Sequence, residues 1–75
     1  MPTSIAVAAA FTPREKEVAA LLLQGLENKE MAAELSISEW TVMFHIRNLY
    51  QKIGLTGDPG SRVKLALILA GVLSK

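Results

Sequence analysis

The sequence is poor in the residues from which chemical sites are most often built. It has no cysteine and a single histidine, His45. The lack of cysteine excludes a disulfide framework and a thiolate metal site, and one histidine cannot form a metal cluster alone. No arrangement of serine, histidine and acid, and no paired carboxylates in a pocket, can be argued from the chain. We therefore expect no enzyme activity, no catalytic residue, no metal, no cofactor and no small-molecule substrate.

Long apolar runs and a basic leader are also missing. No uninterrupted apolar run reaches the roughly 18 residues that suggest a membrane-spanning helix. Residues 1–10 are mostly apolar but have no basic region at their start, so they do not have the pattern of a signal peptide. We expect no membrane partner and a cytoplasmic location.

Charge is distributed unevenly along the chain. The net charge is only +1, but residues 1–42 hold three basic and six acidic residues, whereas residues 43–75 hold five basic residues and one acidic. This asymmetry is typical of a domain that presents one face to a polyanion. The alternative is an ordinary soluble domain in which the charges are unevenly distributed by chance. Because 51% of only 75 residues are hydrophobic, we expect one small domain with apolar surface left for a partner.

Capping signals mark the first two of four predicted helices. Thr12, Pro13 and Glu15 have the features of a capping box at the start of the first helix. Gly25 is expected to end that helix in a left-handed conformation. Asn28 is expected to cap a short second helix, "KEMAAEL".

The third and fourth helices complete an all-α prediction with no convincing strand. Ser38 is expected to cap the third helix, which ends at Gly54, and Ser61 to cap the fourth, "RVKLALILAGVL". The third helix carries a core stripe at steps of four, three and four residues: Val42, Ile46, Leu49 and Ile53. A short helix, a tight turn and a longer helix is the spacing of a helix-turn-helix.

Four motifs occur in order, at unbroken spacing through Gly54: "TPREKEV", "QGLENKEMAAELSIS", "TV" before Met43, and "KIG". Together they resemble the LuxR-type, GerE-like helix-turn-helix domain of bacterial transcription regulators, from residue 11 to about residue 72. The resemblance implies an N-terminal arm at 1–10 and, at 11–75, a four-helix domain of the winged-helix-like class without a wing. It implies a sequence-specific transcriptional regulator at the nucleoid, with double-stranded DNA as partner, either standing alone or excised from a longer protein.

The outward face of the third helix is predicted to meet DNA. The resemblance places the base-reading positions at Met43, Phe44 and Arg47, and the family commonly has lysine where this chain has Met43. Apolar side chains can contact thymine methyl groups, and arginine can bind a guanine edge. The alternative is a degenerate helix-turn-helix that serves as a protein-interaction or dimerisation module, in which Trp40, Met43 and Phe44 bind the partner.

Polar and basic residues around this face are predicted to hold the DNA backbone. They are Lys29, Thr41, Asn48 and Lys52, with Trp40 and Arg62 as possible additions. Thr41 lies at a helix N-terminus, where amides favour anions, and Lys29 begins the helix that crosses the backbone in this motif. The competing interpretation of each lysine is a solvated surface charge. Trp40 either packs against sugar and phosphate or is partly buried against the first helix.

The fourth helix carries two apolar stripes, of which only one can enter the core of so small a domain. The first consists of Val63, Ala66, Leu67 and Ala70, and the second of Leu65, Ile68, Leu69 and Val72. We assign the second stripe to a homodimer interface. The alternative is that it packs under the N-terminal segment "SIAVAAAF".

Overall fold

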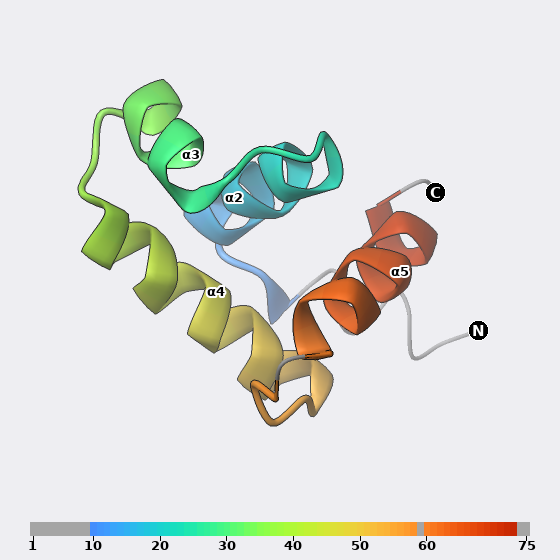
Figure 1. The fold of residues 1–75 in the computed structure, drawn as a ribbon. Helices are drawn as coiled ribbons and strands as arrows, with labels where there is room; N and C mark the ends of the chain where they lie inside the picture. Colours follow the sequence, from blue (N-terminus) through green and yellow to red (C-terminus); the bar gives the residue numbers. More distant parts are fainter. Residues whose placement is uncertain (1–9, 59, 74–75) are drawn as a thin grey trace.

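The computed structural model describes residues 10–58 and 60–73, and only the backbone of the last two of these. Its helices are α2 (Pro13–Leu23), α3 (Asn28–Leu35), α4 (Glu39–Ile53) and α5 (Ser61–Leu73). No strand occurs in this part of the chain, so the all-α prediction is confirmed. In Figure 1, α2 and α3 lie above the long α4, and α5 packs beside α2 and the C-terminal half of α4. The predicted arm lies outside the described residues except for Ala10.

The signals predicted for the two ends of α2 are confirmed. The Glu15 amide donates to Thr12 Oγ1 at 3.1 Å, and the Thr12 amide donates to Glu15 Oε1 at 3.0 Å, which completes the capping box. Gly25 follows the helix with a φ of +87°, and the Leu26 amide donates back to the Leu21 carbonyl at 3.3 Å. The chain therefore reverses at Gly25 and leads directly into α3.

Two of the predicted caps are wrong by one residue. The N-cap of α3 is Glu27, whose amide donates to Glu30 Oε1 at 2.8 Å, and Asn28 is the first helical residue. Ser61 is likewise the first residue of α5, and its amide donates to the Asp58 carbonyl at 2.8 Å. The side chain of Asn28 accepts a hydrogen bond from Arg62 instead of capping α3. At the start of α5, the Asp58 carbonyl accepts from the Ser61 amide.

A tight turn joins α3 to α4 and sets the angle between them. Ser36 adopts a left-handed conformation with φ +57°, which ends α3. Ser38 then caps α4 as predicted: its Oγ accepts from the Thr41 amide at 3.0 Å and lies 2.9 Å from Thr41 Oγ1 in a second hydrogen bond. At the far end Gly54, with φ +92°, closes α4 by donating to the Tyr50 carbonyl at 2.8 Å. The segment from α3 to α4 is thus a helix-turn-helix.

The core forms where α4 meets the other three helices. Val42, Ile46 and Leu49 of α4 are buried as predicted, whereas Ile53 is only partly buried. The rest of the buried apolar cluster comes from Phe11, Val18, Ala19, Leu22, Met31, Ala32, Leu65 and Leu69. Since one narrow stripe of α4 is used for the core, its opposite face points away from the domain.

The predicted dimer role is wrong for two residues of α5, Leu65 and Leu69. The helix turns the stripe that contains them toward the core of its own domain. Leu65 and Leu69 are fully buried in this domain's own core, while Val63 and Leu67 are 65% and 70% exposed. Ile68 is more than one-third exposed, and the side chain of Val72 lies outside the described residues. A helix that is apolar on nearly every side gives no signal of its rotation, which is set here by contact with α2 and α4.

Although α5 is almost wholly apolar, it is short. It has 13 residues, and none of the helices in the described part of the chain combines the length and apolar character needed to cross a membrane.

Candidate nucleic-acid interface

The outer face of α4 gathers the predicted base-reading residues. Trp40, Phe44 and Met43 are 76%, 57% and 47% exposed, and Arg47 is exposed as well. They occupy positions i, i+3, i+4 and i+7, which share one face of a helix. Together they line a hollow of about 60 Å³. Trp40 is therefore not buried against α2, and that alternative is excluded.

Arg47 is the basic group of this face. It forms no hydrogen bond or ion pair with any other residue that the structure describes. Its guanidinium presents five N–H donors in a planar fork, which suits two acceptors side by side on a base edge or a phosphate. The geometry leaves this fork free to bind a ligand.

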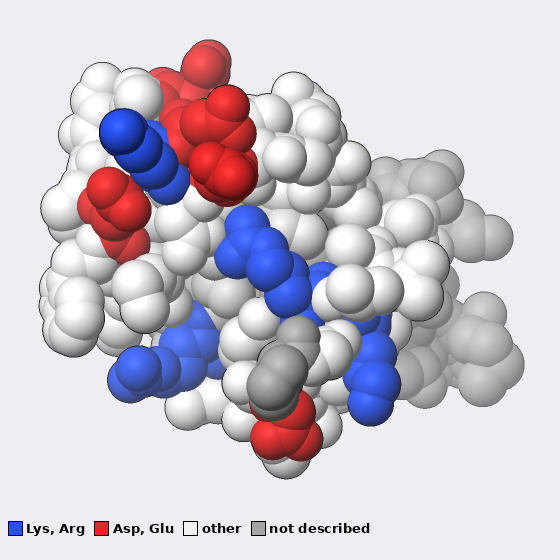
Figure 2. Space-filling model, viewed as in Figure 1, with Lys and Arg blue, Asp and Glu red and all other residues white. Residues whose placement is uncertain are grey.

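The charge asymmetry seen in the sequence has a spatial counterpart. Figure 2 shows most of the acidic side chains gathered over α3 and the start of α4, with one basic side chain among them, whereas the other basic side chains lie lower in the view, around a single acidic group. The side of the domain that carries most of α4 is therefore less acidic than the side that carries α3.

The predicted backbone-binding residues fall into two groups, and the first group consists of Lys29, Thr41 and Asn48. Lys29 is exposed at the start of α3, and Asn48 is half-buried on α4. Neither makes a hydrogen bond or ion pair within the described residues. Thr41 is half-buried, and both its amide and its hydroxyl are bonded to Ser38. Lys29 and Asn48 thus keep their polar groups available, while Thr41 is mainly part of the cap.

Lys52 belongs to the second group, whose charges are used inside the domain. Its Nζ lies 2.6 Å from Glu15 Oε1 and 2.8 Å from the Ala10 carbonyl oxygen. The Glu15 side chain is almost completely buried, and the Lys52 side chain is about two-thirds buried. The predicted phosphate contact is corrected accordingly: the ammonium neutralises a buried carboxylate and ties the end of α4 to the start of α2.

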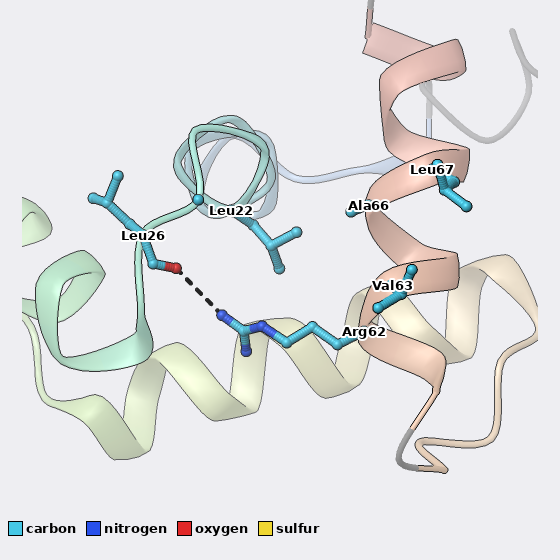
Figure 3. A pocket seen from close by; sticks show the side chains of 7 residues that line it. Leu22, Leu26, Arg62, Val63, Ala66 and Leu67 are labelled. Atoms are coloured by element: carbon cyan, nitrogen blue, oxygen red, sulfur yellow. Dashed lines mark hydrogen bonds between the residues drawn. The ribbon is translucent and has the colours of Figure 1, made fainter.

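Arg62, a possible backbone contact in the sequence, is also engaged within the domain. Its Nη1 donates to Asn28 Oδ1 at 2.8 Å and its Nη2 to the Leu26 carbonyl at 3.3 Å. Figure 3 shows this side chain reaching from α5 across to the turn before α3. It borders an apolar groove that is lined by Leu22, Gly25, Leu26, Val63, Ala66 and Leu67. Arg62 therefore locks α5 against the helix-turn-helix.

The Glu15 carboxyl is held in its charged form despite its burial. Burial raises the pKa of Glu15, but hydrogen bonds from Lys52 and the Thr12 amide, with the charges of Lys52 and His45, lower it by more. The pKa of this carboxyl therefore lies below its ordinary value. The ion pair is expected to remain intact at neutral pH.

Acid should remove the stabilisation that Glu15 contributes. Since its folded pKa is depressed, this contribution is complete above the unfolded pKa of about 4.3 and is lost as pH falls through the folded pKa. Urea unfolding at pH 7, 5, 4 and 3 should show a smaller acid-induced loss of free energy in Glu15→Gln than in the wild type. Glu17→Gln is the control, because Glu17 is exposed and pairs with the exposed Arg14. Equal acid sensitivity in Glu15→Gln and the wild type would contradict this role.

Two residues that border the interface, Gln51 and His45, are not among those predicted to contact DNA; His45 is expected from the sequence to support the scaffold. Gln51 is exposed one turn beyond Arg47, and a glutamine can bond to an adenine edge. Its outward direction was available from helical periodicity. His45 is half-buried, and its ring packs edge-on against Phe44 with centroids 5.6 Å apart. No sequence signal predicts that contact, which helps to orient Phe44.

Metal-binding chemistry has no support at this surface. Within residues 10–58 and 60–73, no group of three or more histidine or acidic side chains is placed to hold a metal ion.

Comparison with known proteins gives a family and a close relative. The sequence model of the family described as bacterial regulatory proteins, luxR family, matches residues 9–69. The chain is 50% identical over 55 residues to the protein named Spore germination protein GerE from Bacillus subtilis (strain 168). The aligned part is 73% of this chain and 74% of that protein. No solved structure matches the chain.

Proposed function

Because the chain belongs to the luxR family of bacterial regulatory proteins, we propose that it regulates transcription by binding specific DNA through α4. The observation that carries this is the exposed face of α4, where Met43, Phe44 and Arg47 lie together on the second helix of a helix-turn-helix. In this motif the second helix enters the major groove and the first crosses the backbone. The family is one of transcription regulators and not a class of enzymes.

Each side chain of the interface has a distinct role in this proposal. Arg47 donates to the N7 and O6 atoms of a guanine, and Met43 and Phe44 contact the neighbouring base edges. Lys29 and Asn48 hold phosphates on either side, and the indole of Trp40 lies near the sugar-phosphate backbone. Lys52 and Arg62 act indirectly, by fixing α4 and α5. Bacterial DNA lies in the nucleoid, so the protein acts in the cytoplasm.

The partner of the exposed side of α5 is a second copy of the chain. Val63 and Leu67 are the most exposed large aliphatic side chains among those that the structure describes in this helix, and Ile68 is exposed as well. Packing them against the same residues of another copy removes this apolar surface from water and forms a two-fold symmetric dimer. A symmetric dimer presents two α4 helices to two half-sites, about one turn of DNA apart.

Selection of bound sequences from a pool of random duplexes tests these roles together. The wild type should enrich one short sequence in two copies related by two-fold symmetry, and it should sediment as a dimer. Leu67→Ser should still enrich the half-site but lose the fixed spacing and sediment as a monomer. Leu23→Ser, which removes an exposed leucine from α2, is the matched control and should behave as the wild type.

The outcomes separate the parts of the proposal. Enrichment of a single half-site by a monomeric wild type would contradict the dimer and leave the DNA-binding role standing. A folded protein that enriches no sequence would contradict the DNA-binding role. It would instead favour a protein-interaction module, for which the exposed Trp40, Met43 and Phe44 are the specific supporting observation.

A further inference from the structure

The hollow on the outer face of α4 is mainly apolar, although this surface is proposed to meet a polyanion. Trp40, Met43 and Phe44 provide apolar walls, and Arg47 completes the rim. The His45 ring packs edge-on against Phe44, which helps to hold one wall in place. The hollow therefore combines an apolar receptacle with an unpaired fork of hydrogen-bond donors beside it.

The size of the hollow limits what it can hold. Its volume is about 60 Å³, whereas a cavity needs roughly 10–15 Å³ to hold one water molecule and about 150 Å³ to hold benzene. A methyl group is close to a water molecule in size, so by this comparison the hollow is large enough for a methyl or a similarly small aliphatic group but too small for an aromatic ring. Small apolar groups are thus the chemical class that fits.

Within the proposed function, on which this inference rests, the major groove offers one apolar group of this size. Thymine carries a methyl group at C5, and 5-methylcytosine carries the same group at the same position of the ring. We propose that the hollow on α4 is a binding site for the C5-methyl group of a pyrimidine next to the guanine bound by Arg47. The site accepts thymine and 5-methylcytosine and discriminates against uracil and unmethylated cytosine.

A different occupant would give a different signature. Four residues at i, i+3, i+4 and i+7 also form the kind of hole into which a leucine of another helix inserts. The free Arg47 fork beside the hollow favours DNA, because a guanine edge in the major groove presents two acceptors, N7 and O6, to such a fork, whereas a leucine-bearing helix would need an acidic side chain beside the leucine.

Replacing single thymines by deoxyuridine tests the site, since only the methyl group is lost. In the duplex obtained by selection, one such replacement next to the guanine should weaken binding about four-fold, the value expected for one buried methyl-sized group. With the pyrimidine changed to cytosine and its partner to guanine, methylation at C5 should strengthen binding by a similar factor. Both comparisons use fluorescence anisotropy at fixed salt.

Two variants locate the effect in the hollow. Phe44→Ala should bind the thymine and deoxyuridine duplexes equally, whereas Lys16→Ala, an exposed residue of α2 outside the hollow, should keep the four-fold ratio. Wild-type binding that is strong and identical for thymine and deoxyuridine at every position would overturn the methyl site alone. No binding to any duplex would overturn the proposed function instead. If the protein then bound a helical peptide, and Phe44→Ala abolished that binding, the occupant of the hollow would be a leucine of another helix.

Discussion

Replacing Arg47 with alanine is expected to lower affinity for the selected duplex about 5- to 150-fold. This corresponds to the roughly 1–3 kcal/mol that a bidentate contact with the correct base contributes. Affinity for unrelated duplexes should fall much less, because those complexes depend mainly on phosphate contacts. Competition titrations followed by fluorescence anisotropy measure both quantities and give their ratio.

Arg47→Lys is the matched control for this variant. It keeps the positive charge but not the planar fork, so it should preserve non-specific affinity while losing most of the discrimination. If Arg47→Ala instead weakens every duplex by the same factor, and Arg47→Lys restores binding fully, the guanidinium touches phosphate and the base-reading assignment is wrong.

Replacing Lys52 with methionine is expected to destabilise the domain by about 1–3 kcal/mol, the cost of leaving a buried acceptor without its partner. Glu15 would lose the contact of 2.6 Å that neutralises it, and the Ala10 carbonyl would lose its donor. A chain of 75 residues has a total stability of roughly 4–11 kcal/mol at about 0.05–0.15 kcal/mol per residue. The variant should therefore show a clearly lower urea midpoint at pH 7.

A double-mutant cycle separates the ion pair from other effects of this substitution. Glu15→Gln and Lys52→Met together should cost less than the sum of the two single changes, because the single variants break the same contact. Lys16→Met removes an exposed lysine and should leave the midpoint nearly unchanged. Normal stability of Lys52→Met, together with weaker binding to all duplexes and a shallower salt dependence, would show that Lys52 contacts phosphate after all.

Local signals in the sequence were sufficient for much of the helical frame. The capping box at Thr12 and the cap at Ser38 involve partners three residues away, so neighbouring letters contain the whole interaction. The same holds for the core stripe of α4, which helical periodicity alone defines. These elements produce the helix-turn-helix, and they place Arg47 on its outer face.

Interactions between distant segments explain what sequence reasoning missed. Lys52 and Glu15 are 37 positions apart, and Arg62 and Asn28 are 34 apart, so nothing near either basic residue reveals that its charge is already used. The rotation of α5 is of the same kind, because both of its faces are apolar and only packing decides that Leu65 faces inward and Leu67 outward. The tertiary structure is thus needed to distinguish residues that are free to bind DNA from residues that stabilise the fold.

The central claim, that the outer face of α4 binds DNA, is tested most directly by titrating the protein into a labelled random-sequence duplex at low and moderate salt. Anisotropy reports binding, and the fluorescence of Trp40, the only tryptophan of the chain, reports contact with α4. We predict saturable binding that weakens steeply with salt, as counterion release requires, with a change in Trp40 fluorescence in the same titration. No binding by the folded protein even at low salt would contradict the claim.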